Sequence, residues 1–344
     1  MQRAILSSHP QKRAFLRIWN HETNRTGREM KEYSNHKSEE QAEWECNGIF
    51  KTHAPYYQVN TSHTTIELLA ADEEEYRTLI SLFGYQAILQ GICVLAFEVM
   101  STHLHGLYAA TEKKALAHME SVLEQYGRYL RRKGRSLDIK ALDPKAFPIP
   151  TLQQLRNEIA YVIRNSFVAR PDVHVFADPH GSGYLYYNPM IKQLPSRPFQ
   201  ELPLKEKRSL LHTRDVEDLP GLRVLDGRVD PACFVDYCLV ESLFPNARKF
   251  VMWTMKNVEA QVTIAISRGE KPALTDEELY GQIYRRCRNQ HNISGPSQLT
   301  RQQKQEMALE LKRELQVPNN QLARTLSLPL QVLDAMFPLS AQRG

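Results

Sequence analysis

Two histidines, His103 and His105, are separated by one residue in a part of the chain with strand composition. An apolar run up to Met100 is followed by a short break and then by alternating residues 103–108, which predicts two consecutive β-strands. Side chains two residues apart on a strand leave the same face, so both imidazoles point together while Leu104 points towards a core. Two imidazoles on one face of a rigid strand make half of a metal site.

A second segment, residues 151–168, predicts an amphipathic helix with Leu155 and Ile159 on its apolar face. Tyr161 and Asn165 lie four residues apart on another face of that helix. Neither segment identifies a site alone. Twelve histidines in 344 residues give a His-x-His pair by chance about 0.4 times, and a tyrosine on an amphipathic helix is ordinarily a packing residue.

Both segments resemble signatures of one protein family. The first resembles the histidine–hydrophobic–histidine motif of HUH endonucleases and, more closely, the REP-associated tyrosine transposases, where a strand ending in Met precedes the motif by two residues. The second is similar to the catalytic-helix signature of those transposases, in which Asn follows Tyr by four residues. Tyr161 lies 56 residues after His105, a spacing typical of the family. The segments are Phe97-Glu98-Val99-Met100-Ser101-Thr102-His103-Leu104-His105 and Ile159-Ala160-Tyr161-Val162-Ile163-Arg164-Asn165-Ser166-Phe167-Val168-Ala169-Arg170.

The chain departs from the family pattern at two places. Ser101-Thr102 stands where the family usually has Pro-Asn, and Ser166 stands where it usually has Pro. The resemblance covers residues 55–190 well and the C-terminal part only loosely.

The resemblance implies a single-tyrosine transposase that cleaves and rejoins single-stranded DNA, at hairpin or palindromic repeats. Tyr161 is then the nucleophile, and a 5′-phosphotyrosine intermediate conserves the energy of the broken phosphodiester for rejoining. His103, His105 and the amide oxygen of Asn165 would bind the cation. An amide oxygen and a substrate phosphate oxygen, added to two imidazoles, shift the preference towards Mg²⁺ or Mn²⁺.

Two other functions remain open from the sequence. A catalytically silent, domesticated transposase would bind DNA hairpins as a regulator, although it would have no reason to keep Tyr161, Asn165 and both histidines together. A phosphoesterase with two His-hydrophobic-Ser/Thr motifs is a weaker hypothesis. His63-Thr64-Thr65 and His180-Gly181-Ser182 match its outer positions, but neither has an apolar residue in the middle.

The elements around the two segments predict an α+β fold. Residues 56–61 have strand composition, and helices begin at Asp72, with acids in its first turn, and at Thr111. Together with the strands around His103, the order β-α-β-β-α is typical of a ferredoxin-like, split βαβ domain with a central antiparallel sheet. The histidine strand is then central and helices cover one face. The proline-rich residues 142–150 indicate a bend.

The chain is predicted to divide into four regions, of which the last is all-α. Its segment 317–333 resembles a helix-turn-helix, with the turn at 327–329. The regions are a polar N-terminal extension at 1–54, partly helical and partly disordered, the catalytic domain at 55–192, a linker at 193–228, and a helical DNA-binding region at 229–344.

Basic residues gather at the end of the helix that begins at Thr111. A solvated helix end matched to the helix dipole explains the cluster as well as a phosphate-contact patch does. The DNA-binding hypothesis includes three further arginines, one on the tyrosine helix, one just after it and one in the C-terminal tail. The candidates are Arg128, Arg131, Arg132, Lys133, Arg135, Arg164, Arg170 and Arg324.

Composition is typical of a globular protein. A net charge of +5 permits binding to nucleic acid without requiring it. No apolar run is long enough for a membrane span, and the start has no continuous signal-peptide core. Five cysteines without Cys-x-x-Cys spacing favour reduced thiols. We therefore expect a cytoplasmic, nucleoid-associated protein, monomeric or homodimeric, without a membrane partner.

Overall fold

The computed structural model describes residues 38–62, 68–166, 173–256, 258–270, 272 and 274–338. The chain forms two compact units, of which the first ends at Met255 and the second begins at Lys256. Among the helices of the described residues, none combines the length and the apolar character that a bilayer span requires. The predictions for Arg170 and for His63 fall on residues outside the described ranges.

Within the described part of the first unit, four strands form an antiparallel sheet in the order β2-β3-β1-β4. The chain therefore has the predicted mixed α and β character, and the strand that carries His105 is an inner one. Part of the predicted bend at 142–150 is instead a strand, because its backbone pairs with β1 and places Phe147 opposite Gln58. The strands are β1 (Tyr56–Asn60), β2 (Cys93–Val99), β3 (Leu104–Ala109) and β4 (Lys145–Pro148).

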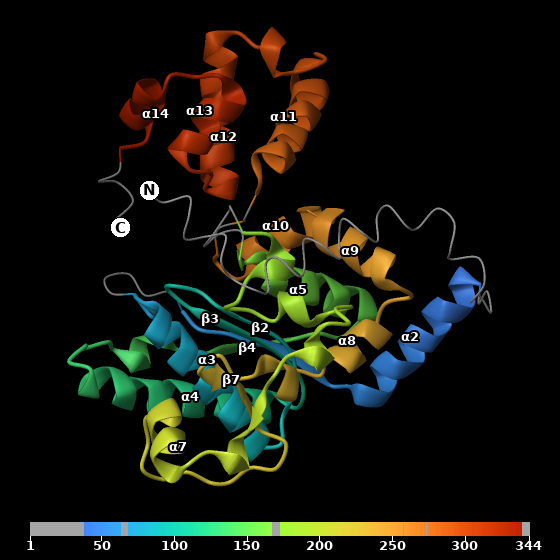
Figure 1. Ribbon diagram of the computed structural model, residues 1–344. Helices are drawn as coiled ribbons and strands as arrows, with labels where there is room; N and C mark the ends of the chain where they lie inside the picture. Colours follow the sequence, from blue (N-terminus) through green and yellow to red (C-terminus); the bar gives the residue numbers. More distant parts are fainter. Residues whose placement is uncertain are drawn as a thin grey trace. The chain divides into compact units, whose positions relative to one another are not determined.

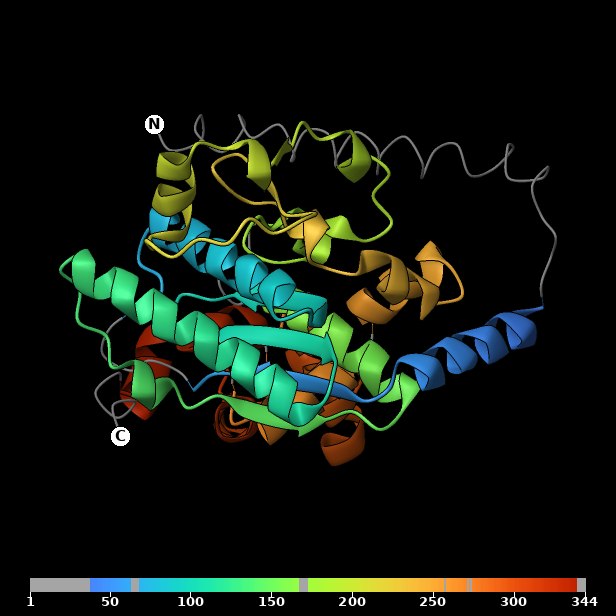
Figure 2. The ribbon, with the colours of Figure 1, turned by 90° about the horizontal axis from the view of Figure 1, so that it is seen from below.

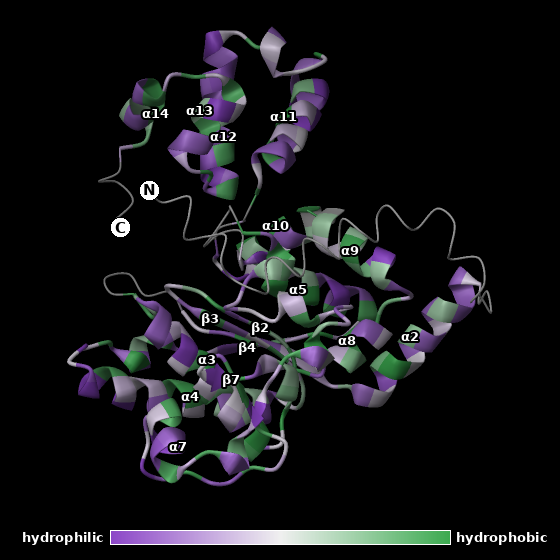
Figure 3. Ribbon diagram, viewed as in Figure 1, coloured by the Kyte–Doolittle hydropathy of each residue, from purple (hydrophilic) through white to green (hydrophobic). Residues whose placement is uncertain are grey.

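Helices cover both faces of this sheet, not one as predicted (Figure 1). Helices α3 (Glu73–Leu89) and α4 (Glu112–Arg132) pack against each other on one face, and Figure 2 shows them crossing the sheet side by side. Helix α5 (Leu152–Arg164) packs on the other face, against β2 and β3. Along α4, hydrophobic and hydrophilic residues alternate, as expected for a helix with one buried side (Figure 3).

The N-terminal extension predicted at 1–54 ends in a helix that belongs to the core of the first unit. Helix α2 (Glu39–His53) begins after Ser38, whose hydroxyl accepts a hydrogen bond from Gln41 N. Its Cys46 and Phe50 are buried, and the Phe50 ring stacks on Tyr56 of β1 with centroids 4.9 Å apart. The packed part of the chain therefore begins before the predicted boundary at residue 55.

Residues 193–228, predicted as a linker, are packed into the first unit. Phe199 is fully buried and Leu222 nearly so. Further on, the backbone returns to the edge of the main sheet, where Val235 bridges Val94 and Asp236 N donates to Val94 O at 2.8 Å. The elements here are β5 (Arg197–Pro198), α7 (Leu204–Leu211), β6 (Arg223–Leu225), β7 (Arg228–Val229), α8 (Tyr237–Ser242) and α9 (Ala247–Lys256).

The described part of the second unit is helical and has its own apolar core. Leu279 and Ile283 are fully buried there together with Leu311 and Leu333. Two short helices are joined by a tight turn in which Ser327 has a φ of 51°, the left-handed conformation that glycine usually supplies. The helices are α10 (Val258–Ser267), α11 (Asp276–His291), α12 (Arg301–Leu315), α13 (Asn319–Leu326) and α14 (Leu330–Met336).

Candidate active site

The predicted histidine pair lies where β3 begins. His105 is in β3, and His103 precedes the strand in a turn closed by a 2.9 Å hydrogen bond from Met100 N to His103 O. Both side chains are buried, and the two rings meet edge to face with centroids 4.6 Å apart. Each ring offers a ligand nitrogen, and these nitrogens lie within 4.8 Å of one another. The pair can therefore contribute two ligands to one cation.

A polar side chain lies against the Nδ1 atom of each imidazole. Thr102 Oγ1 is 2.9 Å from Nδ1 of His103, and Gln58 Nε2 is 3.4 Å from Nδ1 of His105. Metal-ligating histidines usually have such a partner on the second nitrogen, which fixes the ring and its tautomer. Because each Nδ1 already has this polar neighbour, the ligating atoms would be the two buried Nε2 atoms. For His105 this requires Nδ1 to carry the proton and Gln58 to present its amide oxygen.

The predicted tyrosine lies beside His105, one member of this pair. Helix α5 begins after Thr151, whose hydroxyl accepts from Gln154 N. Three turns later the Tyr161 ring meets the His105 ring edge to face, with centroids 5.8 Å apart and an interplanar angle of 88°. Asn165 caps the helix, is buried, and donates from its amide nitrogen to Tyr161 O at 3.1 Å. This bond commits the amide nitrogen to the backbone, so any metal ligand from Asn165 would be its amide oxygen.

A row of polar residues that the sequence reasoning missed crosses the sheet at His105. Asn60 of β1 and Glu98 of β2 are the direct register partners of His105, and all three are buried. Directly opposed residues of antiparallel strands present their side chains on one face. The signal was present in the sequence, because Gln58 and Asn60 alternate within one strand and Glu98 interrupts an apolar run.

A segment from beyond α5 packs against the Glu98 carboxylate. The backbone of 180–182 pairs with the end of β2, with Val99 N donating to His180 O at 3.1 Å. Gly181 lies against the carboxylate so closely that a Cβ there would collide with Glu98 Oε2. A glycine at this position is therefore required for the carboxylate to take the place it has.

Helix α5 is fixed on its other side by a buried arginine. Arg156 forms a bidentate ion pair with Glu43 of α2, at 2.7 and 3.1 Å, and donates from Nε to Leu243 O at 2.7 Å. Its guanidinium lies 5.4 Å from the ring centres of both Phe244 and Trp253. Segments far apart in sequence thus set the position from which α5 presents Tyr161.

Most residues of the predicted basic cluster have partners within the first unit. Lys133 forms ion pairs with Asp72, Glu74 and Glu75, and its hydrogen bond to Asp72 holds the pKa of that carboxyl below its ordinary value. Arg135 pairs with the buried Glu75, Arg128 pairs with Glu124, and Arg132 donates to His212 O. Arg131 is exposed.

Two other predicted basic residues also have partners within their own units. Arg164 is buried, and its Nη1 donates to Thr254 O at 3.2 Å. In the second unit, Arg324 forms a bidentate pair with Asp276 at 2.8 and 3.0 Å. Neither side chain presents a bare charge at the surface of its unit.

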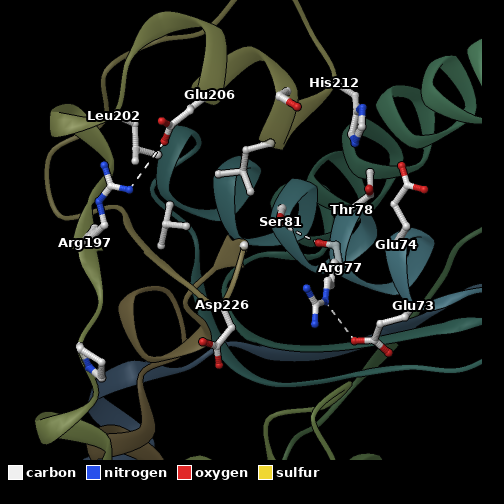
Figure 4. Close-up of a pocket in the computed structure, with 15 residues that line it drawn as sticks. Glu73, Glu74, Arg77, Thr78, Ser81, Arg197, Leu202, Glu206, His212 and Asp226 are labelled. Atoms are coloured by element: carbon white, nitrogen blue, oxygen red, sulfur yellow. Dashed lines mark hydrogen bonds and ion pairs between the residues drawn. The ribbon is translucent and has the colours of Figure 1, made fainter.

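A cavity of about 590 Å³ is lined by α3, α7 and the β6–β7 turn (Figure 4). Neither His103 nor His105 is among the residues that line it. Its arginines are neutralised in place, with Arg77 paired to Glu73 at 3.2 Å and Arg197 paired to Glu206 at 3.7 Å. Among the described residues that line this cavity, none is a predicted site residue.

Glu73 also accepts a hydrogen bond from His180 Nε2 at 2.9 Å, and this bond lowers the pKa of Glu73 to about 2. The His180 ring in turn stacks on Tyr76, with centroids 3.9 Å apart. His180 thereby joins α3 to the end of β2. His180 therefore has a structural role, and this weakens the phosphoesterase hypothesis, which needs it as one of two catalytic histidines.

Comparisons with protein-family models and with curated proteins give no match. Among solved structures, the chain is similar to a REP-associated tyrosine transposase bound to a REP hairpin, at 11% sequence identity and a TM-score of 0.31. The similarity covers 39% of this chain and 78% of that one. The structural relation is therefore distant.

Proposed function

We propose that this chain is a metal-dependent endonuclease and strand transferase for single-stranded DNA, acting at hairpin or palindromic repeats. The observation that carries the proposal is the meeting of Tyr161 with the histidine pair. A phenol on α5 lies edge-on to His105, 5.8 Å between ring centres, with His103 beside it and Asn165 one turn along the helix. A nucleophile and a cation site are the two parts that transesterification of a phosphodiester needs.

The residues present fit a divalent cation. Two buried imidazoles with polar partners on Nδ1 give two nitrogen ligands, and the Asn165 amide oxygen gives a third. With a phosphate oxygen of the substrate added, this donor set favours Mg²⁺ or Mn²⁺. The bound cation would act as a Lewis acid on the scissile phosphate.

Tyr161 performs the covalent step in this proposal. Its phenolic oxygen forms a bond to phosphorus while the bond from phosphorus to the 3′ oxygen breaks, and the phenolic proton leaves to solvent as the 3′-hydroxyl gains one. The product is a 5′-phosphotyrosine and a free 3′-hydroxyl, so the reverse attack rejoins the strand.

The architecture supports this assignment in two ways. The order β2-β3-β1-β4 with α3 and α4 on one face supports a ferredoxin-like assignment of the sheet. Helices α13 and α14 with the Ser327 turn fit a helix-turn-helix. Of the basic residues named from the sequence, we assign phosphate contacts foremost to Arg131 and Arg128, which are exposed, and not to Arg164, which is buried.

The decisive experiment replaces the phenolic oxygen alone. Wild-type protein and Tyr161→Phe are incubated with end-labelled single-stranded hairpin DNA and Mn²⁺, and a covalent protein–DNA band is sought on a denaturing gel. We expect the band from wild type and none from Tyr161→Phe, with binding to the hairpin within about twofold because packing and charge are unchanged.

Tyr184→Phe is the matched control, since this buried tyrosine lies outside the site. It should form the adduct as wild type does. An adduct from Tyr161→Phe would assign the nucleophile to another residue. Hairpin binding by wild type without any adduct, with either cation, would leave the silent DNA-hairpin regulator as the function.

A further inference from the structure

The outward side of α11 carries two exposed tyrosines. Tyr280 and Tyr284 are 36% and 45% exposed, and their ring centres lie 6.5 Å apart. Arg288, also exposed, continues the same line one turn further on. Residues four apart on a helix share a side at a rise of about 6 Å. Tyr280, Tyr284 and Arg288 thus form one stripe, called here the tyrosine–arginine stripe.

The core of the second unit does not account for this stripe. The neighbouring side of α11, about 100° round the helix, supplies the core residues Leu279, Ile283 and Cys287, which are fully buried. Tyr284 has its ring against the backbone of Gly295, where a Cβ would collide with the ring. The ring is therefore held in a fixed direction at the surface, and holding an aromatic ring in place while exposing it suits a binding surface.

A glycine beside the stripe is a second, independent observation. Gly281 lies in the middle of α11 and is exposed, and a Cβ added there would meet nothing within 4 Å. Apart from proline, glycine is the least favourable residue in a helix interior. No packing within the described structure requires it at this position. A gap in the side-chain layer next to two rings allows the helix backbone to approach a ligand closely.

The charge around the stripe is positive. Residues 279–291 contain three arginines and no acid. Arg286 is directed to α12, where it pairs with Glu310 at 3.2 Å and Glu314 at 2.7 Å, whereas Arg288 is exposed on the stripe. The acids of α11 are confined to its first turn.

We propose that the tyrosine–arginine stripe binds single-stranded nucleic acid, with adjacent bases stacked on Tyr280 and Tyr284 and a phosphate at Arg288. Aromatic rings spaced along a positive surface are how proteins hold unpaired strands without reading sequence. A duplex keeps its base faces stacked on each other and cannot use the rings. The stripe recognises features common to DNA and RNA, and the choice of DNA rests on the function proposed above.

The test measures binding of fluorescent twelve-nucleotide oligothymidylate to the full chain by anisotropy, at several salt concentrations. Tyr280→Ala and Tyr284→Ala should each weaken binding roughly tenfold or more, while Tyr280→Phe and Tyr284→Phe should bind like wild type because the ring is kept. Arg288→Ala should lower the salt slope by about 0.7, the value for one phosphate contact on a single strand. Arg313→Ala is the matched control, an arginine on α12 that is 75% exposed, and it should change neither quantity.

Gly281→Ala tests the close approach. It should raise the melting temperature of the protein and at the same time weaken oligonucleotide binding. Unchanged binding by this variant would overturn the close-approach contact. Wild-type binding by both Tyr→Ala variants would overturn the proposal, as would equal losses from Phe and Ala. A concentration-dependent mass that the Tyr→Ala variants abolish, with oligonucleotide binding intact, would assign the stripe to contact between copies of this chain.

Two further arms separate the ligands and the two proposals. Oligouridylate of the same length reports whether RNA is held equally, and a blunt duplex should bind at least tenfold more weakly if stacking on the tyrosines contributes as proposed. Covalent adduct formation on hairpin DNA depends on Tyr161 and not on the stripe. Failure of the stripe therefore leaves the adduct in place, and failure of the adduct leaves oligonucleotide binding in place.

Discussion

Buried histidines have different environments on the two faces of the four-stranded sheet. On the face covered by α3 and α4, His118 has both ring nitrogens bonded within the protein, to the Tyr108 hydroxyl at 3.1 Å and to Phe83 O at 3.0 Å. On the face covered by α5, His103 and His105 stand together with ligand nitrogens within 4.8 Å of one another. The same residue type thus completes a core on one face and forms a candidate cation site on the other.

The cost of burying polar groups explains why the difference is informative. A buried polar group without compensation destabilises a protein by roughly 1–3 kcal/mol. The α3–α4 face keeps one such histidine among apolar residues, whereas the α5 face concentrates Gln58, Asn60, Glu98 and two histidines in one place. A core alone has no use for this concentration. A site that must hold a cation and a reacting phosphate does.

Removing either His103 or His105 should have the largest effect among the variants that test the difference between the two faces. We expect His103→Ala and His105→Ala each to reduce Mn²⁺ affinity and adduct formation below detection, because each deletes one ligand from a site with few protein donors. Isothermal titration calorimetry with Mn²⁺ and the adduct assay measure the two quantities. His118→Leu is the control from the other face and should retain metal binding while lowering stability. Unchanged affinity in both alanine variants would make the pair ordinary strand residues.

The second effect concerns stability and pH on the α3–α4 face. Burial lowers the pKa of His118 to about 4 from 6.5. Between these values the unfolded chain takes up a proton that the native protein does not, so the free energy of unfolding falls as the pH falls from 6.5 towards 4. The loss attributable to His118 amounts to about 3 kcal/mol.

Urea denaturation followed by circular dichroism between pH 7.5 and 4 measures this loss. His118→Leu begins less stable at pH 7.5, because it leaves Phe83 O and the Tyr108 hydroxyl without their bonds. It should nevertheless lose less stability than wild type on acidification. Parallel curves for the two proteins would show that folding does not lower the pKa of His118.

Local patterns in the sequence were enough to predict the elements nearest the site. Alternation over residues 103–108 predicted the strand β3, although His103 itself lies in the turn before it, and α3, α4 and α5 begin at the predicted Asp72, Thr111 and Thr151. These features depend on residues within one turn or one strand of each other. The pairing of Tyr161 with His105 followed from a family resemblance and not from any local pattern.

Features that depend on distant partners were missed. Helix α2 has few apolar residues, so its sequence does not predict that Cys46 and Phe50 are buried. Its packing in the fold depends on the ion pair between Glu43 and Arg156. Strand β4 has no alternation, and its pairing with β1 decides its conformation. Residues 193–228 looked like a linker because their buried side chains, such as Phe199, are spaced without a helix or strand period.

The smallest effect should come from Gln58, which touches His105 and no substrate. Its amide lies 3.4 Å from Nδ1 of His105, and metal binding through Nε2 requires that amide to accept the Nδ1 proton. Gln58→Leu keeps the approximate shape and removes the acceptor. We expect Mn²⁺ affinity to fall by roughly 10–100-fold, which is typical for loss of a ligand's supporting hydrogen bond. Gln58→Glu keeps an acceptor and should restore much of the affinity, a rescue that simple loss of packing would not show.

Gln86→Leu serves as the control, since Gln86 is a buried glutamine on α3. If Gln58→Leu and Gln86→Leu bind Mn²⁺ equally well, the orientation of His105 is set by the strand alone.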